Sequence, residues 1–371
     1  MRIAIVVPYL VRLFGSKAAL SMANALSRDN EVIVYVHSIN PSIINEAKMK
    51  IGNAQLIYNG TTEKNGFGKL FAIKYQVLRG VDRLIATRIA EDHLKSQFDL
   101  VLVMANEGRS VGQFLSVLIK DNRPLTGIVI MELHDHGFHL YHERPYPTLR
   151  LILWPLYPLV HLMERLRFQA FDLVLSNSKW TGSIFEYLYG MNVFMSVPTI
   201  DFDFFSSSRY IDNREPYIAF PTVSLTPEQV EIGKKLVEEG INLVSYGPRK
   251  IDGMHYRGFI PEDRLPQFLG EATAVLFLFD YEALGLVPPE ALAAGTPVIT
   301  LPKEGPQSEL SEMSNVNFAD TYESIRGLCQ LYMSKPKDRA TFESCKRDGF
   351  KLSAEESGRR LIEKIRALKS S

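Results

Sequence analysis

The chain has 371 residues, enough for two ordinary domains that each bury a sizeable core. Its 42 Lys and Arg residues balance 42 Asp and Glu residues, so no overall charge draws it to nucleic acid, and any attraction to an anion must be local. Only two cysteines occur, Cys329 and Cys345, which excludes a disulfide framework or a zinc-ligand spacing and favours a reducing, cytoplasmic setting.

The start of the chain is apolar but short. Met1-Arg2 leads directly into Ile3–Val7, which is too short for an export segment and is typical of a first core strand. The longest apolar run, Leu151–Val160, contains two prolines and falls well short of the roughly 20 residues needed to span a bilayer. We therefore expect a protein that is soluble or that lies on a membrane surface.

In the first half of the chain, short β-rich runs alternate with helical patterns. Strands are predicted at Ile3–Val7, Glu31–Val36, Gln55–Tyr58, Asp99–Met104, Gly127–Met131 and Asp172–Ser176. Helices are predicted at Lys17–Ser27, Leu70–Lys95 and Val111–Ile119. Strands that are apolar throughout and separated by helices indicate a parallel sheet covered on both faces, as in a Rossmann-like domain.

The pattern restarts after a polar, irregular stretch around Ser206–Arg214. Further strands are predicted at Tyr217–Phe220, Asn242–Ser245, Val275–Phe279 and Val298–Leu301, again with helices between them. Two doubly wound domains fit this pattern better than one large sheet, and we place them at residues 1–198 and 199–353, with a last amphipathic helix at 354–371. Ligands of such sheets bind outside the carboxyl ends of the strands, which predicts a site in the cleft between the domains.

The most informative stretch, DYEALGLVPPEALAAGTPVI over residues 280–299, follows the buried run Thr273–Phe279. Pro288 and Pro289 suit the first turn of a helix, where a missing N–H costs nothing. Gly295 suits the C′ position just past the end of that helix. We therefore predict a loop and then a short helix, whose free N–H groups suit a phosphate.

Two acids and a glycine in this stretch indicate a binding site. Glu290, in the first helical turn, can accept paired hydrogen bonds from a vicinal diol such as a ribose, and Glu282 can do the same for sugar hydroxyls. Gly285 lets the loop backbone approach a ligand closely. Taken singly, Glu290 could simply complement the helix dipole and Glu282 could be a solvated loop charge. Their combination at this junction favours binding.

The segment Glu282–Val298 resembles the E-x7-E signature of retaining GT-B glycosyltransferases, most closely glycosyltransferase family 4. Supporting likeness occurs at Phe171–Ser178, Val197–Asp201, Tyr256–Pro261 and Leu265–Leu269. The resemblance implies a GT-B fold, with two Rossmann-like domains facing a cleft and a C-terminal helix that returns to the first domain. It also implies a hexosyltransferase-type enzyme that moves a sugar from a nucleoside diphosphate sugar to an acceptor hydroxyl, with retention of configuration.

The same resemblance assigns roles to residues. The acid matching Glu282 holds the donor sugar hydroxyls at the catalytic centre, and the acid matching Glu290 holds the ribose. Backbone N–H groups that help to bind the sugar and diphosphate belong to Ala283, Leu284, Gly285 and Leu286. In the first domain, Gly15 is the expected remnant of a glycine loop that approaches the diphosphate. No G-x-G-x-x-G follows the first strand, which argues against a dinucleotide oxidoreductase, and no cofactor besides the donor substrate is implied.

The sequence departs from the family where the diphosphate should be gripped. The family has an Arg and, six residues later, a Lys after the first strand of the second domain, but Thr222 and Glu228 stand at the matching positions. Arg249, Lys250 and Lys303 follow other strand ends and are candidate substitutes. Each is alternatively an ordinary exposed cation. We expect at least one of the three to neutralise the diphosphate.

Four of the eight histidines fall within the segment 134–142. By resemblance, His134 matches a histidine that faces the donor sugar and acceptor, where it can hydrogen-bond a hydroxyl or support charge. A metal site formed by His136, His139 and His142 is the alternative. No companion cysteine and no helix-borne H-E-x-x-H accompany them, so we expect no metal.

Two basic segments, Lys69–Arg88 and Arg144–Arg167, mix cations with apolar or aromatic residues. Such segments can lie on anionic lipid, or can pack on the core and expose a solvated face. Several relatives in the family act on lipid-linked acceptors. We therefore expect a cytoplasmic protein with a glycan, lipid-linked or small-molecule acceptor, and we keep work at the cytoplasmic face of the membrane as a hypothesis.

Two other functions stay open from the sequence. A catalytically silent relative that binds a nucleotide sugar or a partner subunit is consistent with Thr222 and Glu228. Another GT-B chemistry, such as sugar-nucleotide epimerisation or phosphorolysis, is the second alternative.

Overall fold

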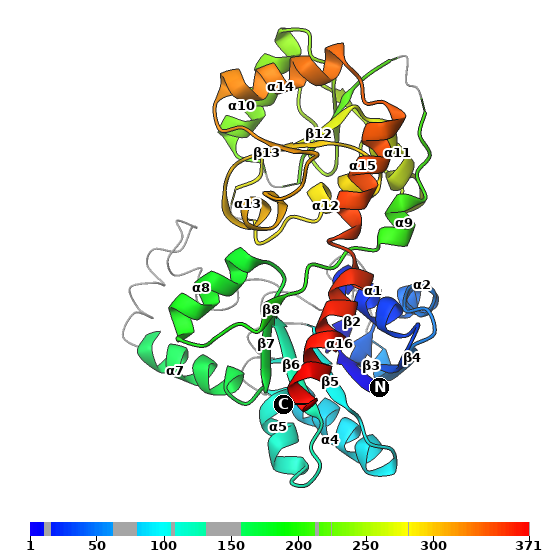
Figure 1. Cartoon of the computed structure of the whole chain (residues 1–371), viewed down its shortest axis with the longest axis vertical. Helices are drawn as coiled ribbons and strands as arrows, with labels where there is room; N and C mark the ends of the chain where they lie inside the picture. Colours follow the sequence, from blue (N-terminus) through cyan, green and yellow to red (C-terminus); the bar gives the residue numbers. More distant parts are fainter. Residues whose placement is uncertain are drawn as a thin grey trace. The chain divides into compact units, whose positions relative to one another are not determined.

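The computed structural model describes residues 1–10, 16–61, 80–104, 108–130, 157–211, 215–223, 225–280 and 282–370. The chain forms two compact units (Figure 1). The first unit consists of Met1–Thr199 together with Gly358–Ser371, and the second consists of Ile200–Ser357. Each unit is built on a parallel sheet with helices, so the predicted Rossmann-like halves are confirmed.

Within the described residues, the first unit contains an eight-stranded parallel sheet of order β2-β3-β1-β5-β6-β7-β8, with β4 paired to β3. Its strands are β1 Arg2–Val6, β2 Tyr9–Leu10, β3 Glu31–Ile39, β4 Gln55–Thr61, β5 Leu100–Val103, β6 Leu125–Ile130, β7 Leu173–Ser176 and β8 Met195–Ser196. Every strand predicted for this half is present. The short strands β2 and β8 were not predicted.

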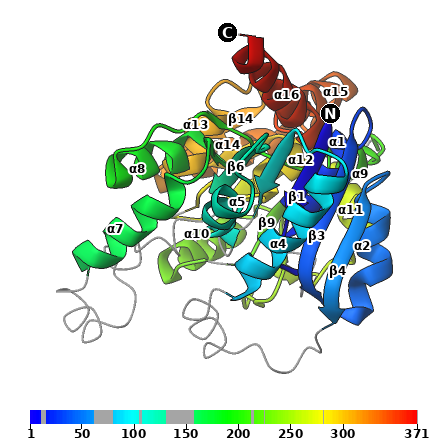
Figure 2. The same cartoon turned by 90° about the horizontal axis from the view of Figure 1, so that it is seen from below.

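The helices of the first unit cover both faces of this sheet (Figure 2). They are α1 Lys17–Leu26, η2 Pro41–Ile43, α2 Ile44–Lys50, α4 Gly80–Lys95, α5 Val111–Leu118, α7 Tyr157–Phe168, α8 Lys179–Tyr189 and most of α16 Ala354–Ser370.

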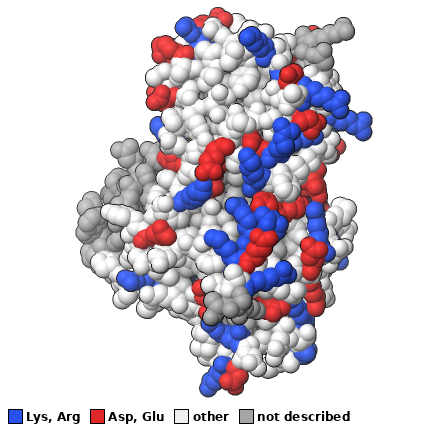
Figure 3. All heavy atoms as spheres, in the orientation of Figure 1, with Lys and Arg blue, Asp and Glu red and all other residues white. Residues whose placement is uncertain are grey.

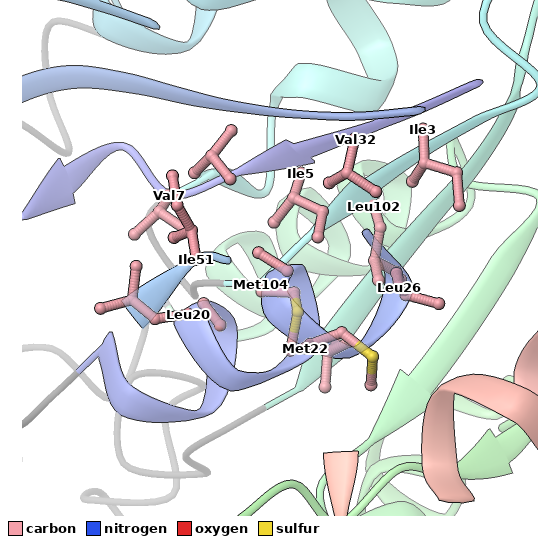
Figure 4. Packing of buried hydrophobic residues seen from close by; sticks show 14 of the residues in the cluster. Ile3, Ile5, Val7, Leu20, Met22, Leu26, Val32, Ile51, Leu102 and Met104 are labelled. Atoms are coloured by element: carbon pink, nitrogen blue, oxygen red, sulfur yellow. The ribbon is translucent and has the colours of Figure 1, made fainter. Parts of the chain in front are cut away.

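Side chains along each strand alternate between two apolar layers, because successive residues of a strand point to opposite faces. Ile3 and Ile5 of β1 belong to the layer under α1 and α16, whereas Ala4 and Val6 belong to the layer under α4 and α5. Figure 4 shows the first layer, in which Leu20, Met22 and Leu26 of α1 face the strand residues. This double burial explains why the strand sequences are apolar throughout.

The second unit contains, among its described residues, a six-stranded parallel sheet of order β11-β10-β9-β12-β13-β14. Its strands are β9 Ile218–Pro221, β10 Leu243–Tyr246, β11 His255–Tyr256, β12 Ala274–Phe277, β13 Val298–Thr300 and β14 Val316–Phe318. Its helices are α9 Phe202–Ser206, α10 Pro227–Glu238, η6 Glu262–Arg264, α11 Leu265–Glu271, α12 Val287–Ala293, α13 Glu304–Leu310, α14 Tyr322–Ser334 and α15 Arg339–Phe350.

The strand order of the second unit reverses at β9, which pairs with β10 on one side and with β12 on the other. In open parallel sheets, ligands bind outside the carboxyl ends of the strands at such a reversal. The loops that follow β9 and β12 are therefore the first place to look for a site.

Two properties of the whole chain bear on its setting. Acidic and basic side chains are interspersed over the face shown in Figure 3, in keeping with the formal net charge of zero. In the part of the chain that the structure describes, no helix combines the length and the apolar character needed to cross a membrane.

Candidate functional site

Glu282 and Glu290, the two acids of the stretch 280–299, follow the carboxyl end of β12. Glu282 is half-buried in the loop that follows the strand. Glu290 lies in the first turn of α12 and is only 7% exposed. Pro288 and Pro289 stand in the first turn of this helix, as predicted, and they favour its start directly after the loop.

The far end of α12 is fixed by a glycine. Gly295 has φ of 84°, which L side chains rarely adopt. Its N–H donates to Leu292 O and the N–H of Thr296 donates to Ala291 O, each at 2.9 Å, which forms a Schellman motif. A Cβ at Gly295 would also lie 2.3 Å from the Phe342 ring. These contacts define the C-terminal end of α12, the helix that carries Glu290.

The position of the Glu290 carboxylate can be inferred from its effect on Tyr246, the last residue of β10. Burial raises the pKa of the Tyr246 phenol above its ordinary value, and the negative charge of Glu290 raises it further. Glu290 therefore reaches toward the carboxyl end of β10, the neighbour of β9.

Two glycines shape the loop between the acids. Gly285 has φ of 69°, and a Cβ there would lie 2.7 Å from the Phe277 ring. Gly305, at the start of α13, donates its N–H to Glu282 O at 3.2 Å. A Cβ on Gly305 would lie 1.6 Å from Ala283 O, so this residue has no room for a side chain. The sequence prediction missed Gly305, although it follows the candidate cation Lys303 by two positions.

A chain of polar contacts ties together the loops after three neighbouring strands. Gln229 of α10 donates from Nε2 to Asp280 Oδ2 at 2.9 Å, and Lys303 Nζ lies 3.2 Å from Asp280 Oδ1. Gln229 Oε1 also accepts from the N–H of Thr226, in a capping box that begins α10. The ends of β9, β12 and β13 are therefore fixed relative to one another. No local pattern predicts these contacts, which link residues 51 and 23 positions apart.

Thr222 and Glu228, which stand where the family has its two cations, follow β9. Thr222 is 1% exposed, and its hydroxyl donates to Tyr246 O at 3.0 Å and accepts the backbone N–H of Arg249 at 3.3 Å. Arg249 also donates from Nη1 to Leu225 O at 3.4 Å. Glu228 is exposed in the first turn of α10. Of the candidate cations, Arg249 thus contacts the loop after β9.

All three candidate cations are exposed, and they differ in what they contact. Lys303 is paired with Asp280 beside the loop after β12, and its side chain is 54% exposed. Lys250 is exposed next to Arg249.

Several predicted site residues lie outside the described residues, namely Gly15 and the histidine segment that includes His134. Within the described ranges, no group of three or more His, Cys, Asp and Glu side chains is arranged to hold a metal ion. Both cysteines are free and buried, and burial raises the pKa of each thiol to about 12.

The basic segment Lys69–Arg88 is described only from Gly80 onward, as the first half of α4. There Ile85 and Ala86 pack into the core, while Arg83, Leu84 and Arg88 are exposed. The described part of this segment is therefore a core-packed helix with a solvated face.

Comparison with known proteins gives a family match and a set of similar folds. Residues 248–347 match the model of the family "Glycosyl transferases group 1". Among curated protein sequences, none matches this chain.

The similar solved structures cover nearly the whole chain. A sucrose-phosphate synthase from Thermosynechococcus elongatus has a TM-score of 0.69 at 13% identity, over 100% of this chain and 99% of that one. A glycosyltransferase from Rickettsia africae has a TM-score of 0.63 at 12% identity, over 100% and 99%. Anabaena HepE in complex with UDP and glucose has a TM-score of 0.62 at 12% identity, over 99% and 100%. At these identities the likeness shows the fold.

Proposed function

We propose that this chain, a glycosyltransferase of GT-B fold as the sequence resemblance predicted, moves a sugar from a nucleoside diphosphate sugar to an acceptor hydroxyl with retention of configuration. One observation carries the proposal: Glu282 and Glu290 flank the loop at the strand-order reversal, inside the segment that matches the family. A uridine diphosphate sugar is the first donor to test, because the similar HepE structure contains UDP and glucose.

The proposed sugar transfer requires this loop to bind the donor sugar and to stabilise the departing diphosphate. As the bond to the diphosphate lengthens, positive charge develops on the sugar and negative charge on the leaving group. In the proposal, the backbone N–H groups of residues 283–286 face the sugar and diphosphate, Glu282 accepts from the sugar hydroxyls and Glu290 accepts from the ribose hydroxyls. His134 remains a predicted partner of the donor sugar or the acceptor. We propose no cofactor besides the donor.

A cation is still needed for the departing diphosphate, and we propose Arg249. Its backbone is tied to Thr222, at the position where the family has its arginine, and its guanidinium contacts the same loop. Lys303 is a weaker candidate because Asp280 already partly neutralises its charge. Lys250, which is exposed beside Arg249, is the third candidate.

Thermal unfolding with a panel of nucleoside diphosphates and their sugars tests the donor site, because a ligand that binds the folded state raises the melting temperature. We expect Glu290→Gln to abolish the rise caused by both the preferred nucleoside diphosphate and its sugar. We expect Glu282→Gln to abolish only the additional rise caused by the sugar. Glu323→Gln, an exposed acid in the first turn of α14, is the matched control and should change nothing. A panel without any shift, or shifts that survive both variants, would remove the proposal.

A catalytically silent relative is the second candidate function. It is favoured by Thr222, whose hydroxyl already makes two hydrogen bonds and carries no charge, and by Glu228, which places a negative charge where a cation was expected. Slow release of nucleoside diphosphate from its sugar without an acceptor would exclude the silent relative. Conversion of the nucleotide sugar into an epimer would instead indicate another GT-B chemistry.

The acceptor belongs to the proposal as well. We propose a glycan, lipid-linked or small-molecule hydroxyl, offered at the cytoplasmic surface of the membrane. The basic segment Arg144–Arg167 motivates this setting, and its described part is α7.

A further inference from the structure

The helix α7 lies at the margin of the first unit in both views (Figures 1 and 2). Its inner face is defined by aromatic contacts. Phe168 is fully buried, with its ring centroid 4.8 Å from that of Phe185 in an edge-on arrangement. His161, two turns earlier, stacks on Tyr189 at 4.6 Å. These contacts fix which side of the helix faces the body of the unit.

The acid of α7 also points inward. Glu164 is 7% exposed, and its carboxylate lies 2.7 Å from Arg109 Nη1 and also pairs with Arg167. Glu164 is the one acidic residue in the helix sequence. No carboxylate of α7 therefore remains on its outer surface.

The outer surface of α7 is apolar, whereas the exposed face of a helix in a soluble protein is usually polar. Leu159, Leu162, Met163 and Leu166 are 56%, 51%, 38% and 50% exposed. Their spacing of i, i+3, i+4 and i+7 places them in one stripe, on the side of the helix opposite His161, Glu164 and Phe168. Helices of soluble proteins normally turn such a stripe toward the core. We call these four residues the α7 stripe.

The surroundings of the α7 stripe add a cation and more apolar surface. Arg165 is exposed on the flank of the stripe. Gln113 of α5 donates to Leu166 O at 3.3 Å, and Val117, one turn beyond Gln113, is 71% exposed. An apolar strip with a flanking cation suits a surface that is apolar inside and negatively charged outside.

We propose that the α7 stripe docks the first unit on an anionic phospholipid bilayer, with the four side chains among the acyl chains and Arg165 at the phosphates. The docking rests on α7 alone, whereas its purpose, to bring a lipid-linked acceptor to the donor site, rests on the proposed function.

A second copy of the chain fits the α7 stripe less well. A twofold contact presents the same patch from both subunits, so each Arg165 would meet a helix surface that offers no carboxylate of α7 to pair with it. Four half-exposed side chains also offer only a few hundred Å² of apolar surface, whereas a stable dimer buries about 800 Å² on each partner.

Vesicle flotation of the full chain tests the docking. We expect the chain to float with vesicles of phosphatidylcholine mixed with phosphatidylglycerol, and to float poorly with phosphatidylcholine alone. The double variant Leu162→Ser/Leu166→Ser should lower the partition coefficient at least ~10-fold, because it removes two aliphatic side chains from the apolar phase. Arg165→Glu should lower it on the anionic vesicles only.

Controls separate docking from folding and from donor binding. Leu331→Ser, a leucine of α14 that is 48% exposed, should float like the unchanged protein. The α7 variants should keep their melting temperature and their response to nucleotide sugars, whereas Glu290→Gln should lose that response and still float.

Three results would overturn the docking. The first is flotation that is equal on both vesicle types, and the second is flotation that is unchanged in the double variant. The third is a dimer, detected by light scattering, that the double variant abolishes. The donor-site tests are unaffected by any of these results, so the two proposals fail separately.

Discussion

By resemblance, Thr222 stands at the position of the family's arginine, and its buried hydroxyl holds the backbone of another cation, Arg249. Its oxygen is engaged by Tyr246 O and by the Arg249 N–H, and its surroundings leave it 1% exposed. A long cationic side chain could not replace it without disturbing the end of β9. The same contacts bring Arg249 of a neighbouring loop to that strand end, where we propose that it supplies the missing positive charge.

This geometry ranks the cations. We expect Arg249→Ala to weaken binding of the preferred nucleoside diphosphate by about 10- to 100-fold, because a charged hydrogen bond contributes about 1.5–3 kcal/mol. Lys303→Ala should weaken it only about 2-fold, since Asp280 shares the charge of Lys303. Isothermal titration calorimetry measures both values. Lys335→Ala, an exposed cation beyond α14, is the control, and equal losses in all three variants would contradict the ranking.

Lys337 is a second residue with an unusual position. Its ammonium donates to Gly270 O at 2.6 Å and to Thr296 Oγ1, inside the second unit. Burial lowers the pKa of Lys337 from 10.5 to about 7. The folded state thus releases this proton near neutrality, while the unfolded state keeps it until near the ordinary value. Between these limits the unfolded state binds more protons, so this residue makes the free energy of unfolding rise with pH.

We expect Lys337→Met to remove that rise. The difference in the free energy of unfolding between the unchanged protein and the variant should change by roughly 1 kcal/mol per pH unit above neutrality. Urea unfolding at a series of pH values measures it. The exposed Lys335→Met variant should show no such trend, and a constant difference for Lys337→Met would contradict the titration.

At the scale of elements, the loop after β12 packs directly against α13. Gly305 donates its N–H to Glu282 O, and the Ala283 carbonyl occupies the space where a Cβ would be. The Asp280–Lys303 ion pair ties the same two segments a second time. The position of Glu282 therefore depends on α13 as well as on its own loop.

We expect Gly305→Ala to lower the melting temperature and to weaken nucleotide-sugar binding, because the Ala283 carbonyl must move. Gly327→Ala is the matched control. Nothing lies within 4 Å of a Cβ at Gly327, inside α14, so alanine there should stabilise the protein by up to about 1 kcal/mol. Thermal unfolding with and without the donor compares the two variants. Unchanged donor binding in Gly305→Ala would show that the loop does not depend on α13.

The elements also show what sequence patterns can predict. The strand runs were predictable because burial on both faces makes them apolar throughout, and α12 was predictable because its prolines and Gly295 mark both ends. The Gln229–Asp280–Lys303 contacts follow no local period and became visible only in the structure. The outward direction of the α7 stripe was equally hidden, because the spacing of its apolar residues does not say which face is buried.

At the scale of the whole molecule, the last helix belongs to the first unit. Leu361, Ile362 and Ile365 of α16 join the same apolar layer as Ile3 and Leu26. Gly358 faces Leu26 and Met22 so closely that a Cβ there would lie 3.1 Å from Leu26 Cδ2. The core of the first unit is thus completed by residues that follow the entire second unit in the sequence.

We expect Leu361→Ala to cost about 2–5 kcal/mol in the first unit, because it leaves a cavity in this layer. Leu368→Ala, at a position of the same helix that is 49% exposed, should cost within about 0.5 kcal/mol. Hydrogen exchange locates the effect: amides of β1 and β3 should lose protection in Leu361→Ala, while those of β12 keep theirs. Equal loss in both units would mean that they unfold together.

This arrangement has a consequence during translation. The strands and α1 of the first unit leave the ribosome well before Leu361 and Ile365, and Ile200–Ser357 must be synthesised in between. At elongation rates of about 5–20 residues per second, that interval lasts roughly 10–30 s. For this period we expect the nascent first unit to expose the apolar side chains of α1 that Leu361, Ile362 and Ile365 cover in the complete protein, a surface that a holding chaperone could bind.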